Sequence, residues 1–469
     1  MACEEDTSAA LCPFEGPEKL LEIWFAPSPA FVPDANTAPK GRSGLLAVDR
    51  KVWEDMLDIV KCKVLSVIYG DEMDAYLLSE SSFFVSPHRL ILKTCGTTLN
   101  LLGLPRILSI AKTHAKLSKV YQCFYSRKSF MFPDKQLGPH KDWSMEVQYL
   151  DRIFDNGSAY TVGKVNGDHW LLYMTSPLGL HSGSNTEVSS LASSMVSLQD
   201  DNWAIVGQGG LYNLPCLPPT QDYTIEILMT HLSARARAAF FAPPSVDPCG
   251  TGEDSPSSHA QRISNEIGIS DIFPKERTHL DAYAFTPCGY SSNALISLPH
   301  ADGDDDVEFS APPQACEAKK KGEGYYTIHV TPEEGWSYAS FECNVPLAPK
   351  SPVRSSRASA MPDLRTLVQR VVRIFEPGKI TLTLFISSAE NASASEDDGG
   401  ETAVDAAQRA FKAALTRPSC GGNSNSLLDT THREDGPLRT ADVPRYKRTD
   451  KINYEFGGYD LAFASFELI

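Results

Sequence analysis

The chain has 469 residues, of which 42% are hydrophobic, so it is long enough to bury a large core in one domain or in two. The 59 Asp and Glu residues outnumber the 43 Lys and Arg residues, and this formal net charge of -16 argues against a general binder of nucleic acid or of anionic membranes. The N-terminus lacks the basic and apolar regions of a signal peptide, and no apolar stretch approaches membrane-spanning length. These features predict a cytoplasmic protein.

Eleven cysteines are spread along the chain without any C-x-x-C pair. Their odd number and their spacing disfavour a zinc ribbon or a disulfide framework. We therefore expect free thiols and no metal site.

The first third of the chain alternates between short predicted strands and helices. Residues 14–25 fit either type: a strand places Glu18 and Glu22 on one face, whereas a helix adds Glu15 to them. In both cases carboxylates cluster. The elements expected after this segment are a helix over 49–60, strands over 63–68, 75–78 and 83–95, a helix over 99–116 interrupted by Pro105, a strand over 120–130, a helix over 143–153, and a strand pair over 158–165 and 169–175.

The rest of the chain repeats this mixture of elements between polar stretches. Strict alternation in a strand over 221–229 puts Asp222, Thr224 and Glu226 on one face. The elements expected after it are a helix over 234–241, a loop over 243–258, a strand from residue 280 with a tight turn at 287–289, strands over 325–330 and 336–341, a helix over 364–375, a strand over 380–387, a helix over 404–415 and one last strand over 454–468. Segments without periodicity predict insertions at about 178–220, 298–323 and 388–450. The pattern predicts a layered α+β sandwich, and no strong internal repeat is visible.

The most distinctive stretch is a serine-rich turn between two apolar runs, Leu78-Ser-Glu-Ser-Ser82. Alone it would indicate only a hairpin in a sheet protein. Six further strings accompany it: Phe14-Glu-Gly-Pro-Glu-Lys-Leu-Leu-Glu22, Leu92-Lys-Thr-Cys-Gly-Thr-Thr98, Phe124-Tyr-Ser-Arg-Lys128, Thr224-Ile-Glu-Ile-Leu-Met229, Pro287-Cys-Gly-Tyr-Ser291 and Tyr326-Thr-Ile-His-Val-Thr-Pro-Glu333. In this order they resemble the eukaryotic pyruvoyl-dependent S-adenosylmethionine decarboxylase proenzymes, over nearly the whole chain outside the insertions.

The resemblance implies a fold and a maturation step. The fold is a four-layer αββα sandwich, with two central antiparallel β-sheets flanked by helices, formed by residues 1–469 as a single domain. The chain is expected to cut itself between Glu80 and Ser81, which gives a β chain of residues 1–80 and an α chain of residues 81–469. Ser81 then becomes a covalent pyruvoyl group, the expected cofactor.

The resemblance also implies catalytic roles. His329 takes the α-proton of Ser81 during self-cleavage, and Ser291 stabilises the tetrahedral intermediate. Alternation supports the first role, since it places His329 on a polar strand face with Thr327. A lone histidine on a strand is more often an incidental surface residue, but its surroundings here favour the functional interpretation.

Cys95 is implied to return a proton to the substrate after CO2 has left. The usual fate of a lone cysteine is a small buried hydrophobe. Lys93 shares a strand face with Cys95, which makes it a candidate for the cation that lowers the thiol pKa.

Two binding sites follow from the same resemblance. Phe14 and Phe285 match an adenine-stacking pair and Glu333 a ribose ligand, while Glu15 and Glu18 match carboxylates needed for activity or processing. A putrescine site is implied at Glu22, Lys93, Phe124, Asp222, Thr224, Glu226, Glu342, Phe385 and Tyr459. Buried carboxylates repel one another, and a diamine dication would relieve a cost of several kcal/mol.

The expected function is conversion of S-adenosylmethionine to its decarboxylated form and CO2, which supplies the aminopropyl donor for spermidine and spermine. The alternative is a catalytically inactive regulatory paralogue that partners an active decarboxylase. Such a paralogue should lack Ser81, Cys95 or His329, and this chain keeps all three. Family members occur as monomers and as homodimers, and the sequence leaves both open.

Overall fold

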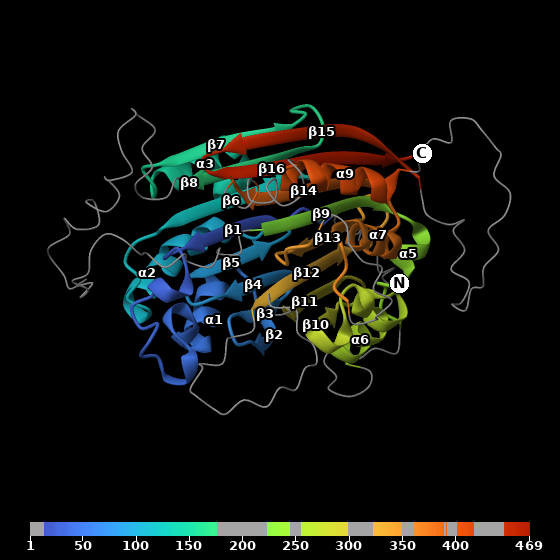
Figure 1. Ribbon diagram of the computed structural model, residues 1–469. Helices are drawn as coiled ribbons and strands as arrows, with labels where there is room; N and C mark the ends of the chain where they lie inside the picture. Colours follow the sequence, from blue (N-terminus) through green and yellow to red (C-terminus); the bar gives the residue numbers. More distant parts are fainter. Residues whose placement is uncertain are drawn as a thin grey trace, which may run out of the picture.

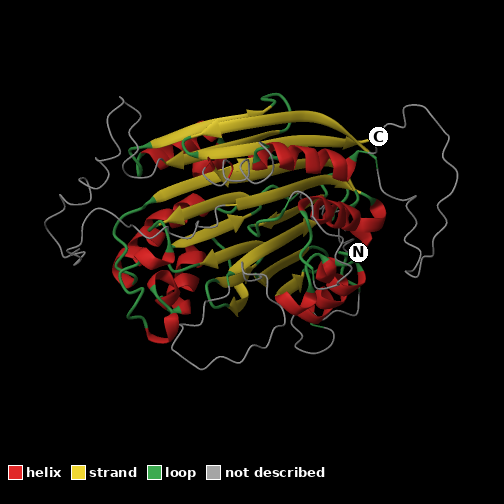
Figure 2. Ribbon diagram, viewed as in Figure 1, coloured by secondary structure: helices red, strands yellow, loops and turns green. Residues whose placement is uncertain are grey.

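Two eight-stranded antiparallel sheets lie face to face and carry helices on their outer faces (Figures 1 and 2). The computed structural model describes residues 14–175, 223–243, 255–298, 322–348, 360–388, 391, 401–416 and 445–469. This arrangement confirms the predicted α+β class and the four-layer αββα sandwich.

The N-terminal half of the chain forms the first sheet, with the strand order β2-β3-β4-β5-β1-β6-β8-β7. Its strands are β1 (Lys19–Trp24), β2 (Val64–Tyr69), β3 (Asp74–Leu78), β4 (Ser81–Val85), β5 (Arg89–Thr94), β6 (Gln122–Lys128), β7 (Gly157–Gly163) and β8 (His169–Thr175). Its outer helices are α1 (Arg50–Ile59), α2 (Leu104–His114) and α3 (Trp143–Asp151).

The C-terminal half forms the second sheet, with the order β10-β11-β12-β13-β9-β14-β16-β15. Its strands are β9 (Tyr223–Leu232), β10 (Thr278–Ala284), β11 (Tyr290–Ser297), β12 (Glu323–Thr331), β13 (Tyr338–Cys343), β14 (Pro377–Ser387), β15 (Tyr446–Phe456) and β16 (Tyr459–Leu468). Its helices are α5 (Ala234–Ala238), α6 (Pro256–Glu266), α7 (Leu364–Phe375) and α9 (Ala403–Leu415).

The two strand orders are the same, because each strand of the first sheet corresponds to the strand numbered eight higher in the second. The sequence shows no strong repeat, so the duplication is visible in topology rather than in residues. Strands that hold the same place in the two sheets can therefore be compared with each other.

Four clusters of buried hydrophobic residues pack between the layers. One lies between the first sheet and its helices, and another between the second sheet and its helices. The remaining two mix residues of both sheets, so they fill the space between the sheets. Stacking of Phe84 on Tyr325, with ring centroids 4.2 Å apart, is a direct contact across this space. Central strands are therefore buried on both faces, which explains their nearly continuous apolar sequences.

Several boundaries differ from the sequence predictions. Of the two alternatives left open for residues 14–25, the strand is correct, but it covers only Lys19–Trp24. Pro105 lies in the first turn of α2 instead of interrupting a longer helix. The predicted loop over 243–258 contains the start of α6, which its N-cap Ser255 begins. The last predicted strand is a hairpin, β15 and β16, because Gly457-Gly458 turns the chain.

The predicted insertions are only partly described. The stretch 178–220 lies outside the described residues, as does most of 298–323. Helix α9 confirms the helix predicted inside 388–450, but β15 begins at Tyr446, so that insertion ends before residue 450. Among the helices of the described ranges, none is long and apolar enough to cross a membrane.

Candidate active site

The turn between β3 and β4 holds the Glu80-Ser81 peptide bond. Glu80 has a φ of 57°, a left-handed conformation that costs a residue with a Cβ roughly 1 kcal/mol. Ser81 is fully buried; its Oγ has no nitrogen or oxygen partner among the described residues, and the Cys62 thiol lies beside it. A hydroxyl that is not held elsewhere, next to the carbonyl of a strained residue, is suited to attack that carbonyl.

Cys95 follows β5 and reaches back to the same peptide bond. Its thiol donates a hydrogen bond to the carbonyl oxygen of Glu80, the oxygen that gains negative charge if Ser81 attacks. Burial raises the pKa of Cys95 well above its ordinary value, and the negative charges of Glu80 and Glu18 raise it further. The thiol therefore keeps its proton near neutral pH, as a proton donor must.

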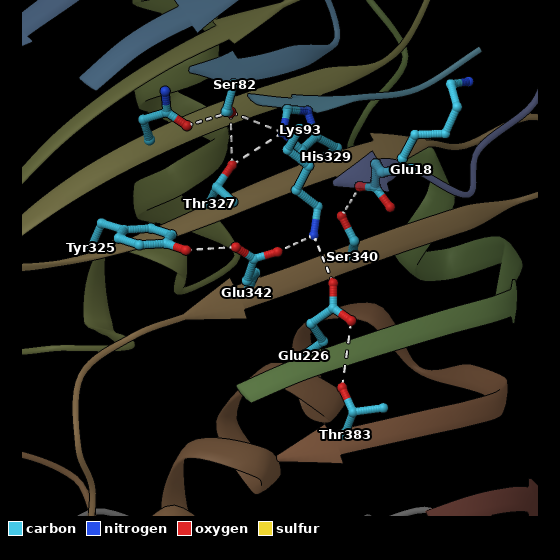
Figure 3. Close-up of polar contacts among 12 residues, drawn as sticks. Glu18, Ser82, Lys93, Glu226, Tyr325, Thr327, His329, Ser340, Glu342 and Thr383 are labelled. Atoms are coloured by element: carbon cyan, nitrogen blue, oxygen red, sulfur yellow. Dashed lines mark hydrogen bonds and ion pairs between the residues drawn. The ribbon is translucent and has the colours of Figure 1, made fainter. Parts of the chain in front are cut away.

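His329 lies at the centre of a buried polar network between the sheets (Figure 3). Its Nδ1 is 3.2 Å from Ser291 Oγ, and its Nε2 is 3.0 Å from both Ser82 Oγ and Thr327 Oγ1. Ser82 also donates to Asn293 at 2.6 Å. Burial lowers the pKa of His329 to about 3, so the ring is neutral and able to accept a proton.

A second carboxylate faces Glu80. Burial raises the pKa of Glu80 to about 7, and the nearby Glu333 adds to this shift. Glu333 also acts on the half-buried Cys288, whose pKa is raised to about 12, first by burial and then by this carboxylate. The predicted ribose ligand is thus placed next to the predicted cleavage site.

The two predicted adenine-stacking rings are partly exposed. Phe14 lies against Gly96, directly after the predicted proton donor, where the left-handed φ of 60° favours glycine. Phe285 directly follows β10, and its ring packs on Tyr283 with centroids 5.0 Å apart. Gly289, in the turn that follows, lies beside this ring. The role of this pair in adenine stacking stays a prediction.

Glu15 and Glu18 are both buried just before β1. Glu15 accepts hydrogen bonds at 2.8 and 2.7 Å from the backbone N–H groups of residues 131–132. Glu18 accepts from Tyr338, at 2.6 Å, and from Ser340, so it joins the two sheets. Burial raises the pKa of both carboxyl groups.

The ammonium group of Lys93 lies between the two sheets, among carboxylates (Figure 3). Its Nζ lies 3.1 Å from Glu226 and 2.5 Å from Glu342, and Tyr325 donates to Glu342 at 2.6 Å. Burial opposes the ammonium charge, but Glu342, Glu226 and Glu18 raise the pKa of Lys93 well above its ordinary value. One lysine thus compensates two buried carboxylates that belong to the predicted diamine site.

The charged groups that act most strongly on the Cys95 thiol are Glu80, Glu18 and Lys19, so the cation among them is Lys19. Glu18 acts on both Lys93 and Cys95, so this carboxylate connects the acidic cluster to the thiol.

The remaining residues of the predicted diamine site lie along neighbouring strands. Glu22 accepts from Trp24 at 2.7 Å and lies 3.4 Å from Arg89. Directly opposite Glu22 in the β1–β6 register is Phe124.

The rings of Phe124, Phe385 and Tyr459 pack together, with centroids 4.8 to 5.5 Å apart. Thr224 is paired with Phe385 in the β9–β14 register. Asp222 lies outside the described residues. The structure therefore gathers the described members of this set between the two sheets.

A family model described as Adenosylmethionine decarboxylase matches residues 12–467. The chain belongs to this family. It is 33% identical to the S-adenosylmethionine decarboxylase proenzyme of Saccharomyces cerevisiae over 81% of this chain and 84% of that protein. Identity to the proenzyme of Xenopus laevis is also 33%, over 80% of this chain and 84% of that protein. A crystal structure of the Trypanosoma brucei AdoMetDC-delta26 monomer superposes with a TM-score of 0.45 at 18% identity, covering 82% of this chain and 99% of that one.

Several residues of this adenosylmethionine decarboxylase site were absent from the sequence prediction. Ser82 and Asn293 hold the histidine network, Tyr325 binds a carboxylate of the acidic cluster, and Lys19 faces the thiol. Alternation had placed Thr327 on the face of the predicted base, and this signal was correct. For Lys19, the available signal was a lysine inside the strand Lys19–Trp24, among apolar residues.

Proposed function

We propose that the chain is a self-processing decarboxylase of S-adenosylmethionine that cuts itself between Glu80 and Ser81. The observation that carries the proposal is the convergence on one peptide bond of a Ser81 hydroxyl free of nitrogen and oxygen partners in the described structure and a Cys95 thiol bonded to the Glu80 carbonyl. The products would be an 80-residue chain and a 389-residue chain.

Self-cleavage proceeds through an ester. Ser81 Oγ attacks the Glu80 carbonyl carbon, the C–N bond breaks, and the nitrogen of Ser81 becomes a free amine. His329, neutral and on the opposite sheet, then takes the α-proton of Ser81. The bond between Cβ and Oγ of Ser81 breaks at the same time, and the leaving group is the new C-terminal α-carboxylate of Glu80. The dehydroalanine that remains takes up water and releases ammonia, which gives a pyruvoyl group at the new N-terminus.

The residues present fit this group, since the pyruvoyl would form in place at Ser81, the buried first residue of β4. When formed, it would supply a carbonyl that condenses with the substrate amine and accepts the electron pair left by CO2. Cys95, protonated near neutral pH, would then return a proton to the substrate α-carbon. Phe14, Phe285 and Glu333 would hold the nucleoside part of the substrate.

The test is release of labelled CO2 from carboxyl-labelled S-adenosylmethionine by the purified protein. Cys95→Ala should release CO2 at least tenfold more slowly, since it removes the proton donor. The matched control is Cys123→Ala, a buried cysteine of β6 that packs in the hydrophobic cluster between the first sheet and its helices. Absence of CO2 release from the cleaved wild-type protein would overturn the proposed function and would favour the regulatory paralogue.

The acidic cluster supports putrescine as an activator. Lys93 lies against Glu226 and Glu342, and Arg89 lies 3.4 Å from Glu22, so a diamine would bind beside carboxylates that single cations already contact. Putrescine should accelerate cleavage or CO2 release in the wild type and should do so less in Asp222→Asn. Rates that respond to putrescine in neither protein would refute this part.

A further inference from the structure

Lys19 is a fully buried lysine for which the steps above have no use. It begins β1, opposite Thr94 in β5 and opposite Arg127 in β6. Its Nζ donates to the carbonyl oxygen of Gly96 at 2.8 Å and lies 5.3 Å from the ring centre of Phe130. Within the described ranges, no carboxylate lies within 4 Å of this ammonium group. Such a buried cation is costly unless another group compensates it.

The charges around Lys19 come from four neighbouring elements. Cys95 is the strongest attractive partner, followed by Glu146 of α3 and by Glu15 before β1, while Arg127 of β6 repels it. Glu146 is already engaged, because it binds Arg127 at 2.8 Å and accepts from Tyr125 at 2.5 Å. Glu15 is held by two backbone N–H groups. Both carboxylates are therefore held by other groups, and the strongest attractive partner of Lys19 is Cys95, which is charged only as a thiolate.

The duplicated fold shows that this position does not require a charge. The register row that contains Lys19 runs Ser81, Thr94, Lys19 and Arg127 in the first sheet. In the second sheet, β9 holds the place that β1 holds in the first, and its buried side chains in the cluster against the helices are apolar, namely Tyr223, Ile225, Ile227 and Met229. The buried lysine is thus specific to the half that carries Ser81 and Cys95.

We propose that Lys19 is a positioning residue for Cys95: its ammonium group stabilises the thiolate formed when Cys95 donates its proton, and its hydrogen bond to Gly96 holds the adjoining backbone. This inference rests on the proposed function. In the step concerned, the S–H bond of Cys95 breaks, the proton goes to the substrate α-carbon, and the electron pair stays on sulfur. Burial lowers the pKa of Lys19 to about 8, so the group is positively charged below that pH. The opposing charges at the thiol are Glu80 and Glu18, with Cys62 alongside.

The test measures the titration of Cys95 directly. The purified full chain is treated with methyl methanethiosulfonate, a small thiol reagent, between pH 6 and 10, and the labelling rate of the Cys95 peptide is read by mass spectrometry. Lys19→Gln removes the charge but keeps an N–H donor for Gly96, and it should label Cys95 about tenfold more slowly at pH 7, where Lys19 is charged, since one pKa unit is a factor of ten. Lys19→Arg should stay within about twofold of the wild type.

Two controls separate this role from a structural one. Lys128→Gln alters another buried lysine with a lowered pKa, which contacts Thr381 and Asp168 and not the thiol, and it should leave Cys95 labelling unchanged. Cys288 is the internal reference in every sample. Equal Cys95 rates in Lys19→Gln and the wild type would overturn the proposal, as would an equal loss in Lys128→Gln.

The labelling does not depend on catalysis. A wild type that labels as expected but releases no CO2 would contradict the proposed function and leave the Lys19–Cys95 interaction standing. Normal CO2 release with no effect of Lys19→Gln on labelling would contradict only the inference about Lys19. Where Lys19→Gln does not fold, an alkaline limb of the pH profile of CO2 release that moves to higher pH in Lys19→Arg supports the proposal, because arginine keeps its charge. A limb that stays at the wild-type pH in Lys19→Arg contradicts it.

Discussion

The two halves of the molecule share one strand order but carry different chemistry at equivalent positions. Across the inner face of the first sheet, one register row runs Leu77, Ser82, Lys93, Leu20 and Ser126. In the second sheet, a row across the corresponding strands runs Asn293, Thr327, Glu342, Glu226 and Thr383.

These two rows meet between the sheets. Ser82 contacts Thr327 at 2.9 Å, and Lys93 contacts Glu342, so the two rows contact each other through polar side chains at two places (Figure 3). In the proposed mechanism the first half supplies the nucleophile, the thiol and the cation Lys93, whereas the second half supplies the base and the two carboxylates that contact Lys93. The comparison teaches that the duplication provides the frame, and that the site exists only where the diverged halves face each other.

The largest expected effect comes from removing one reactive group from each half. Ser81→Ala should abolish cleavage completely, since no hydroxyl remains to attack Glu80. His329→Ala should allow the attack but block loss of the α-proton, so an ester-linked chain should accumulate. Hydroxylamine cuts esters and spares amides, so gel analysis after its addition should show two chains for His329→Ala and one for Ser81→Ala. The same response in both variants would contradict the division of roles between the halves.

A smaller effect should follow from breaking the ion pair between the halves. In the uncleaved Ser81→Ala background, Lys93→Met leaves Glu226 and Glu342 buried without their cation. We expect the free energy of unfolding in urea to fall by about 3 to 5 kcal/mol. Lys164→Met, which disrupts an exposed ion pair with Asp450, should cost less than about 1 kcal/mol. Similar losses in both variants would show that the buried pair does not hold the halves together.

The smallest effect concerns acid stability. The pKa of His329 is about 3 in the folded chain and near 6.5 when unfolded, so the unfolded state binds more protons between these values and stability falls as the pH falls. This ring should account for a loss of about 1 kcal/mol between pH 6.5 and 5.5. His329→Gln in the Ser81→Ala background should lose that share and keep the contributions of His88 and His140, whose pKa values are also lowered. An unchanged pH dependence in urea unfolding would contradict a buried neutral His329.

Alternation along single strands was enough to predict much of the site. It placed His329 with Thr327 and grouped Thr224 with Glu226, because side chains at every second position share a face. It could not predict contacts across the sheets. Lys93 and its partner Glu342 are 249 residues apart, and nothing local specifies that their strands face each other.

Other misses have local causes. Helix α6 opens with Pro256-Ser-Ser258 after a polar stretch, and these residues are more typical of a loop until the cap at Ser255 is seen. The β15–β16 hairpin was taken for one strand because aromatic residues continue on both sides of its turn. The proposed interaction of the Lys19 ammonium group with Cys95 depends on where the chain turns at Gly96, and strand periodicity does not predict that turn.

The measurement that tests the central claim most directly is the intact mass of the freshly purified protein. We predict two chains of 80 and 389 residues. The larger should be lighter by about 17 Da, one ammonia, than the same chain with an N-terminal serine, which distinguishes a pyruvoyl group from a proteolytic nick. A single 469-residue mass that persists in putrescine, or a larger chain that begins with an intact serine, would contradict self-processing at Ser81.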